Sequence, residues 1–266
     1  MLFRSLNAAD YGVPQDRRRL FLVGTRNGLQ SPDYPVPSNQ RISVEDAIGD
    51  LPNADSFEQL NLSDVVPVKW QTTSAYGRKL RGFDRDPADY SYRRNFDHDL
   101  LTCSIRTQHT KSSQARFAAT LQGKTDPISR FRRLELTGLC NTLRAGTDSA
   151  RGAHTSPRPI HPLFARVITV REAARLHSYP DWFRLHATKW HGCRQIGNSV
   201  PPLLARALAS ELLKAQGIKP SKPQKILDRG EASLLSFDMG SASKYFQVSR
   251  NTIAQRSRKI PVIAGS

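Results

Sequence analysis

The sequence has no long apolar run and few cysteines. No stretch of its 266 residues approaches the roughly 20 uninterrupted apolar positions that a membrane-spanning helix needs. Residues 1–25 mix charge, proline and glycine where a secretory signal would carry an apolar run. We therefore expect a soluble, cytoplasmic protein of a prokaryote, without a membrane partner.

The shortage of cysteine excludes two small-domain frameworks. Cys103, Cys140 and Cys193 lie far apart with no CxxC pair, so neither a disulfide framework nor a zinc ribbon is predicted. His186 and His191 lie close to Cys193 in the sequence. No second ligand pair accompanies them, so we favour a structural or solvated role over a metal site.

Acidic residues are also scarce, with 23 against 40 Lys and Arg, which gives a formal charge of +17. Such a charge attracts polyanions, so nucleic acid is the leading partner and a merely soluble basic protein is the alternative. Residues 104–134 hold seven basic residues against the single acid Asp126, interleaved with Phe117 and Phe131. This segment predicts contact with a phosphate backbone, or else a solvated charged face. Its basic residues are Arg106, Lys111, Arg116, Lys124, Arg130, Arg132 and Arg133.

The chain opens with two predicted strands, residues 2–9 and 18–25, joined by a turn. They predict a hairpin, and because a lone hairpin is not stable, we expect further strands upstream. Residues 27–162 show weak periodicity, with proline and glycine throughout, and predict a loop-rich region.

Two helices are predicted after this region. Thr169 and Glu172 have the spacing of a capping box, which opens a helix through His177. A second helix begins after Asn198 and Ser199, with two prolines in its first turn. One face of it carries an apolar stripe of Leu204, Ala207, Leu208 and Leu212.

The last segment, residues 214–266, has ten basic and three acidic residues. Residues 219–223 predict a linker. Residues 242–256 predict two short helices around Gln247, a hypothetical helix-turn-helix in which Gln247 stands where the turn usually has glycine.

Two short segments suggest a ligand site. The strand period of two places Gln15, Arg17 and Arg19 on one face, where they form a polar clamp suited to a phosphate, a base carbonyl or a carboxylate. Basic decoration of an edge strand is the alternative. Asn198 and Ser199 lie at the mouth of the second helix, which suits either anion binding or simple capping.

Together these segments resemble the cytosine-5 DNA methyltransferase family. Residues 6–15 with Arg17 and Arg19 resemble its eighth conserved motif, residues 166–181 its ninth and residues 194–208 its tenth. The resemblance implies an α/β fold: a partial Rossmann-like methyltransferase catalytic domain, contributing its end hairpin and C-terminal helix, with an inserted loop-rich target-recognition domain.

The resemblance also implies boundaries and roles. The hairpin would end the catalytic domain, Gln15, Arg17 and Arg19 would lie near a flipped cytosine and its phosphates, and Asn198 and Ser199 would border S-adenosylmethionine. Thr169, Arg171 and Glu172 would brace the recognition domain. The expected divisions are 1–26 for the hairpin, 27–164 for the recognition domain, 165–215 for the ninth and tenth motifs, and 216–266 for the basic tail.

One departure limits the expected activity. The family's nucleophile is a Cys that follows Pro, whereas the cysteines here follow Thr102, Leu139 and Gly192. We therefore expect a C-terminal half, part of a restriction-modification system, that acts on double-stranded DNA. It would hold only part of the S-adenosylmethionine pocket, and would be inactive without an N-terminal partner that carries the nucleophile and a Gly-rich loop. The alternatives are a catalytically dead DNA-binding protein or the remnant of a frameshifted gene. A tRNA-methylating relative is disfavoured, because about 140 residues separate the eighth and ninth motifs.

Overall fold

An antiparallel hairpin begins the chain, as the sequence predicts. In the computed structural model, β1 (Leu2–Asn7) pairs with β3 (Arg18–Val23), from Leu2 opposite Val23 to Asn7 opposite Arg18. A 3-10 turn, η1 (Ala8–Tyr11), and the short strand β2 (Gln15–Asp16) connect them. Gly12 follows the turn with φ 77°, a backbone conformation that favours glycine.

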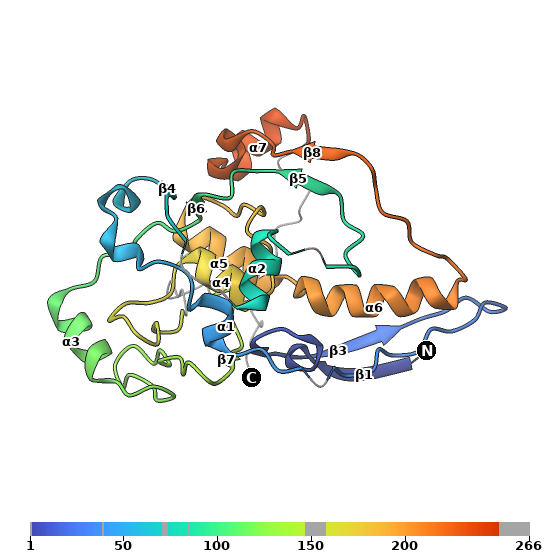
Figure 1. Cartoon of the computed structure of the whole chain (residues 1–266), viewed down its shortest axis with the longest axis horizontal. Coiled ribbons are helices and arrows are strands. Elements are labelled where there is room, and N and C mark those ends of the chain that lie inside the picture. The colour runs from blue at the N-terminus through green and yellow to red at the C-terminus, as the bar shows by residue number, and fades with distance from the viewer. Residues whose placement is uncertain (1, 39, 71–73, 85, 147–157, 250–266) are drawn as a thin grey trace, which may run out of the picture. The chain divides into compact units, whose positions relative to one another are not determined.

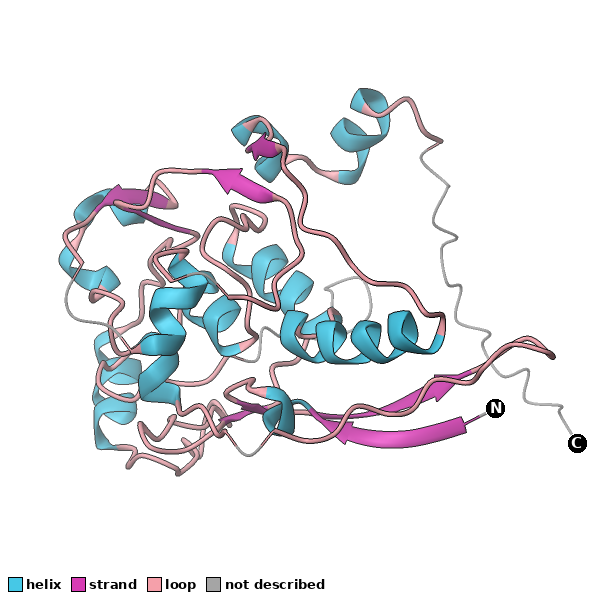
Figure 2. Ribbon diagram, turned by 45° about the vertical axis from the view of Figure 1, so that its right-hand side comes forward, coloured by secondary structure: helices cyan, strands magenta, loops and turns pink. Residues whose placement is uncertain are grey.

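The long helix α6 (Pro202–Ala215) runs beside this hairpin in both views (Figure 1, Figure 2). Leu204 is buried in one cluster with Leu6 and Val13, and Ala207 and Leu208 pack against that cluster. The predicted apolar stripe is therefore confirmed as part of the core at Leu204, Ala207 and Leu208. Its last member, Leu212, remains exposed.

The structure describes residues 2–38, 40–70, 74–84, 86–146 and 158–249. The chain divides into two compact units, Met1–Arg229 and Gly230–Ser266. The described strands of the first unit pair only two by two, as β1 with β3, β2 with β7, β4 with β6 and β5 with β8. The α/β class is confirmed, and the Rossmann-like part of the prediction remains a prediction.

Residues 27–164 contain many loops and short elements. Three short helices begin at polar caps, Ser43, Ser74 and Thr110, whose side chains accept hydrogen bonds from first-turn amides. The sequence analysis missed all three. The elements are α1 (Val44–Ile48), η2 (Ala54–Ser56), η3 (Glu58–Asn61), β4 (Val65–Pro67), α2 (Ala75–Arg81), β5 (Arg93–Asn95), β6 (Leu100–Thr102), α3 (Lys111–Ala119) and β7 (Cys140–Asn141).

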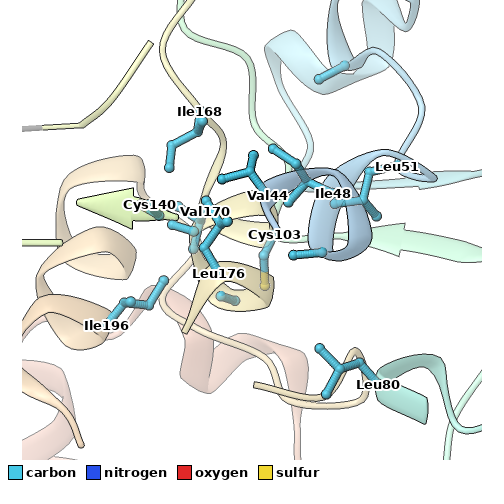
Figure 3. Close-up of a cluster of buried hydrophobic side chains, with 14 of the residues drawn as sticks. Val44, Ile48, Leu51, Leu80, Cys103, Cys140, Ile168, Val170, Leu176 and Ile196 are labelled. Atoms are coloured by element: carbon cyan, nitrogen blue, oxygen red, sulfur yellow. The ribbon is translucent and has the colours of Figure 1, made fainter. Parts of the chain in front are cut away.

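Helix α4 (Val170–Leu176) has the predicted capping box: Thr169 accepts from the Glu172 amide, and Glu172 accepts from the Thr169 amide. One hydrophobic core surrounds it. Val170 and Leu176 of α4 share this core with Val44 and Ile48 of α1 (Figure 3). A single core thus spans the predicted boundary at residue 164, and that boundary stays a prediction.

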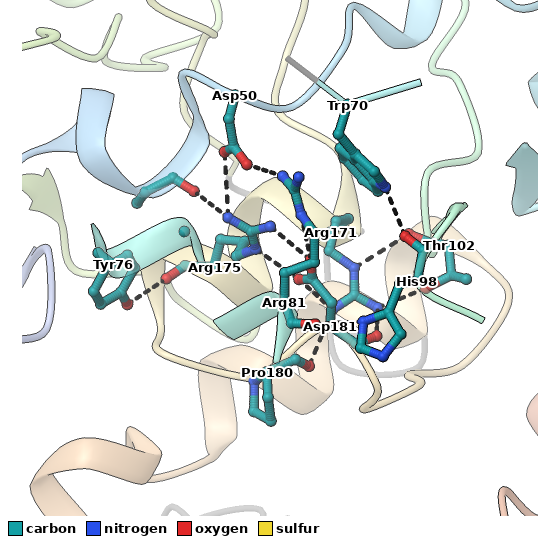
Figure 4. A network of polar contacts seen from close by, with 12 residues as sticks. Asp50, Trp70, Tyr76, Arg81, His98, Thr102, Arg171, Arg175, Pro180 and Asp181 are labelled. Carbon is teal, nitrogen blue, oxygen red and sulfur yellow. Dashed lines mark hydrogen bonds and ion pairs between the residues drawn. The ribbon is translucent and has the colours of Figure 1, made fainter. Parts of the chain in front are cut away.

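Buried arginines add a polar layer to this core (Figure 4). The guanidinium of Arg175 makes two hydrogen bonds of 2.6 Å to the carboxylate of Asp181 and one of 3.3 Å to Asp50. Asp50 also accepts from Arg81, which stacks 3.6 Å from the Trp70 ring. Burial alone would raise the pKa of Asp181, but the neighbouring arginines keep it below its usual range.

Arg171 connects α4 to β6. It donates 2.7 Å to the Thr102 hydroxyl and 2.9 Å to the carbonyl oxygen of Phe183, and its backbone amide donates to the Cys103 carbonyl. This side chain therefore contacts residue 102, which lies in the predicted recognition region, and its bracing role stays a prediction. Glu172 instead pairs with Arg166, at 2.7 and 2.9 Å.

The chain divides into its two compact units after Arg229, and the predicted tail boundary at residue 216 stays a prediction. Helix α6 is followed by β8 (Ile226–Asp228), which pairs in parallel with β5 inside the first unit. The second unit contains η5 (Ala232–Ser236) and α7 (Met239–Tyr245), with Gln247 at φ 53° directly after them. The second helix of the hypothetical helix-turn-helix lies outside the described residues. No described helix is long and apolar enough to cross a membrane.

Replacing Asp181 by Asn should destabilise the chain strongly, because two arginines would be left beside an uncharged amide in the interior. Losing one partner of a buried ion pair costs about 3 kcal/mol or more. Thermal unfolding checks this, with Asp84→Asn as the control, since the Arg78–Asp84 pair is equally well formed but exposed. Equal melting temperatures for the two variants would contradict the stabilising role of the buried network.

Candidate functional site

Arg17 joins three parts of the chain that are distant in sequence. Its side chain is 3% exposed. It donates 2.9 Å to the Leu143 carbonyl, 2.9 Å to the Gly197 carbonyl and 3.1 Å to the Ser199 carbonyl. Burial and the charge of Arg19 lower its pKa to about 10, so it remains protonated at neutral pH. The Arg17 guanidinium therefore holds the hairpin against residues 143 and 197–199.

Gln15 and His177 complete this buried network. The Gln15 amide nitrogen donates to the Leu176 carbonyl at 3.2 Å and lies 3.0 Å from Nδ1 of His177, while its oxygen accepts from the Leu143 amide at 3.1 Å. His177 Nε2 lies 3.2 Å from the Ser199 carbonyl, which assigns the proton to Nε2. Burial and the Arg17 charge lower the pKa of His177 to about 3, so the ring is neutral.

The three residues of the predicted clamp therefore differ in exposure. Gln15 and Arg17 are buried and their hydrogen bonds serve the protein itself. Arg19 is exposed on β3, with one bond of 2.7 Å to the Arg18 carbonyl. Of the three side chains, only that of Arg19 is exposed, so only it could contact a ligand without a change in the structure.

The predicted helix mouth at Asn198 and Ser199 is wrong in its local structure. Residues 189–198 form helix α5 (Lys189–Asn198), which the sequence analysis missed, and Ser199 ends that helix. Helix α6 is capped instead by Pro201, without a side-chain bond, and the Leu203 amide already donates to the Ser178 hydroxyl. The first turn of α6 is thus not an open anion site.

Asn198 and Ser199 also differ in what they offer a ligand. The Asn198 side chain is exposed and makes no hydrogen bond to a residue that the structure describes. The Ser199 hydroxyl donates 2.8 Å to the Ile196 carbonyl, and its own carbonyl accepts from Arg17 and His177. Asn198 therefore fits contact with a polar cofactor, and Ser199 holds the loop that presents it.

Gly197 is needed where α5 meets residues 144–145. A Cβ at this position would lie 2.4 Å from the Ala145 nitrogen and 2.5 Å from the Arg144 carbonyl carbon. Only glycine allows this approach, which brings the Gly197 carbonyl within reach of Arg17.

All three cysteines are buried free thiols. Burial raises the pKa of the Cys140 thiol far above its usual range and that of Cys193 to about 11. Cys103 accepts a hydrogen bond from the Leu185 amide at 3.4 Å. None of them is exposed to a substrate, as a cysteine nucleophile must be.

The basic residues of segment 104–134 fall into two groups. Arg133 donates to the carbonyls of Phe117, Ala118, Thr120 and Pro162 and so caps α3. Arg106 and Arg116 lie 3.3 and 3.5 Å from Asp55 and Asp126. The exposed members that remain for phosphate contact are Lys111, Lys124, Arg130 and Arg132.

The predicted histidine cluster forms a ring contact. His186 and His191 lie with ring centroids 4.6 Å apart. Within the described part of the chain, no group of three or more His, Cys, Asp or Glu side chains is arranged to hold a metal ion.

Comparison with known proteins identifies relatives of this chain. Residues 3–214 match the family described as C-5 cytosine-specific DNA methylase. The type II methyltransferase M.XorII of Xanthomonas oryzae is 59% identical over 97% of this chain and 61% of its own length. M.AplI of Arthrospira platensis is 53% identical over 82% of this chain and 49% of its own length.

A solved structure agrees with these relatives. A DNA modification methyltransferase encoded within an E. coli prophage superposes with a TM-score of 0.63 at 32% identity, and the match covers 82% of this chain and 60% of that one. The chain thus spans about half to three fifths of the length of these three proteins.

Acid should weaken the fold through His177. Its pKa falls from 6.5 in the unfolded chain to about 3 in the folded one, so the unfolded chain binds the extra proton. The contribution of the neutral His177 ring to the free energy of unfolding is therefore fully present above pH 6.5 and is lost as the pH falls toward 3. His177→Gln should make the melting temperature fall less steeply between about pH 6.5 and about pH 5. His191→Gln, an exposed control, should leave that slope unchanged, and equal slopes for all three proteins would contradict the prediction.

Gly197→Ala should force residues 144–145 away from α5 and lower stability by about 1–3 kcal/mol, the usual cost of overpacking. Gly24→Ala is the matched control, because nothing lies within 4 Å of a Cβ built there. Chemical denaturation of the two variants measures the difference. A Gly197→Ala chain as stable as Gly24→Ala would show that the close approach is not required.

Proposed function

Because the chain belongs to the C-5 cytosine-specific DNA methylase family, we propose that it is the DNA-recognition and cofactor-closing half of a type II DNA (cytosine-5) methyltransferase. The reaction would transfer the methyl group of S-adenosylmethionine to C5 of a flipped cytosine in double-stranded DNA. S-adenosylmethionine supplies the methyl group when bound. Every role below concerns residues of this chain.

The observation that carries the proposal is the position of Arg17. Its guanidinium binds the carbonyls on either side of Asn198, and it lies two positions before Arg19 on the hairpin. The Arg17 guanidinium thus holds the backbone on both sides of the exposed Asn198, and the exposed Arg19 follows it closely in the chain. Arg19 would contact the flipped base or its phosphate, and Asn198 would contact the methyl donor.

The chain would depend on a second segment for the nucleophile. Addition of a thiolate to C6 of cytosine makes C5 nucleophilic, and Cys103, Cys140 and Cys193 are all buried. We therefore assign the nucleophile and the Gly-rich cofactor loop to an N-terminal half. Arg19 and Asn198 would complete a pocket formed mainly by that half.

The hairpin offers a surface for such a half. Phe3, Leu20 and Leu22 are 71%, 61% and 60% exposed, and they lie on adjacent antiparallel strands. Apolar strand positions of this kind are usually covered by another layer. The strands of an N-terminal half would cover them, and binding to the folded chain would raise its melting temperature.

The second candidate is a DNA-binding protein without catalysis, including the remnant of an interrupted gene. The buried cysteines favour it. The exposed Asn198, which would face the methyl donor, supports the enzyme, because a protein that only binds DNA needs no contact with a methyl donor.

Reconstitution distinguishes the two. Residues 1–266 are mixed with the part of M.XorII outside its matched region, and transfer of labelled methyl groups from S-adenosylmethionine to DNA is followed with the melting temperature. We expect no transfer by either part alone, and methylation with raised stability on mixing. DNA binding that never leads to methylation would favour the second candidate, and methylation by residues 1–266 alone would overturn the divided active site.

Arg19→Ala should reduce methylation by the mixture about 10²- to 10³-fold, the usual loss when one polar contact in a reaction site is removed. Its melting temperature should remain that of the wild type, because the exposed guanidinium supports no core residue. Arg26→Ala, an exposed arginine beyond the end of β3, is the control. Wild-type turnover by Arg19→Ala would contradict the role assigned to it.

A further inference from the structure

A hollow of about 650 Å³ lies where the hairpin, the segment before α1 and the segment before β7 meet. Its volume lies within the range of ligand-binding sites. Three arginines from distant parts of the sequence line it, namely Arg18, Arg41 and Arg132. None of the candidate-site residues Gln15, Arg17, Arg19, Asn198 and Ser199 is among those that line the hollow.

Backbone hydrogen bonds fix the walls of the hollow. Strand β2 pairs in parallel with β7, and the Cys140 amide donates 3.0 Å to the Pro14 carbonyl. The Val44 amide donates 3.0 Å to the Gly138 carbonyl, which joins α1 to the same wall. Arg132 is held by its own carbonyl, which accepts from the Ile160 amide at 2.8 Å. The three arginines therefore project from a rigid concave surface.

The charges of the hollow favour a singly charged anion. Arg41 and Arg132 form no ion pair or hydrogen bond through their side chains with any residue that the structure describes. Asp16 accepts 2.8 Å from Asn7 and lies 3.9 Å from Arg18, and Asp10 is the second acid of the lining. Three guanidiniums against two carboxylates leave one net positive charge. A phosphodiester carries one negative charge, and guanidinium groups bind its oxygens in pairs.

We propose that this hollow binds a backbone phosphodiester of the DNA substrate through Arg41 and Arg132, with Arg18 at its rim. The proposal rests on the proposed function, since it takes DNA as the substrate. The site would hold DNA beside the junction of the hairpin and the recognition region. Because a phosphodiester is the same for every base, the site adds affinity without choosing a sequence.

The salt dependence of DNA binding tests the proposal. Each phosphate contact contributes about 0.9 to the slope of log K against log salt concentration. In the full chain, Arg41→Ala and Arg132→Ala should each weaken binding to a duplex and make the slope shallower, by about one contact together in the double variant. Arg132→Lys, which keeps the charge but loses the paired donors, should restore the slope and only part of the affinity.

Arg93→Ala is the matched control, because it removes one exposed arginine from β5, which both views place on the opposite side of the first unit from β7 (Figure 1, Figure 2). Its binding and slope should equal those of the wild type. Melting temperatures show that every variant is folded. Inorganic phosphate at the same ionic strength as chloride should not compete with DNA, because the duplex is held by several phosphate contacts at once and a free phosphate makes only one.

The outcomes separate this inference from the function on which it rests. A wild-type chain that binds no DNA would overturn the proposed function. DNA binding that Arg41→Ala and Arg132→Ala leave unchanged would overturn only the phosphate site. An equal loss in Arg93→Ala would show that the effect is one of general charge, and competition by inorganic phosphate would show a site for a free anion; either result would also overturn it.

Discussion

A guanidinium cannot lie in a protein interior without acceptors around it, and this chain buries several. Arg175 is fully buried, and its guanidinium makes four hydrogen bonds, two to Asp181 and one each to Asp50 and the Ala47 carbonyl. Arg171, one turn earlier on α4, takes the carbonyls of the loop at residues 180–183 together with Thr102. The path of the surrounding loops is set by this requirement, because unpaired charges would cost several kcal/mol each.

Buried polar groups also bind the backbone of the candidate site. Arg17 binds carbonyls at residues 143, 197 and 199, and His177 binds the last of them from the other side. Neither group is exposed, so neither contacts a substrate directly in this structure. Under the proposed function, they would hold the backbone that carries Arg19 and Asn198, so that buried groups support an exposed binding surface.

The sequence predicts well the elements whose signals are local. The Thr169 and Glu172 spacing is sufficient to place α4, and alternation is sufficient to place β1 and β3. Helix α5 was missed because Gly192 and Gly197 lower its helix propensity. Both glycines are required by neighbours that local sequence does not reveal, Val170 and residues 144–145. Without α5, the Asn198 and Ser199 pair resembled the start of the next helix instead of the end of this one.

The site was only partly predictable for the same reason. The motif spacing identified Gln15, Arg17 and Arg19, but it gave no means of separating buried from exposed guanidiniums. His177 was noticed only as a helix end, because its partner Gln15 is 162 residues away. The net charge of +17 suggested nucleic acid, yet five of the arginines that contribute to it, Arg17, Arg81, Arg166, Arg171 and Arg175, are buried. The residues left to contact a polyanion are therefore fewer than the composition implies.

The central claim is that the buried arginines join residues 27–164 and the segments after residue 164 into one cooperative unit. Native-state hydrogen exchange of three amides tests it most directly: Ala173 in α4, Asp181, which donates to the Leu80 carbonyl, and Ser104, which donates to the Asp64 carbonyl. The account predicts the same opening free energy and the same denaturant dependence for all three. A lower opening free energy for the Ser104 amide than for the Ala173 amide would contradict the claim.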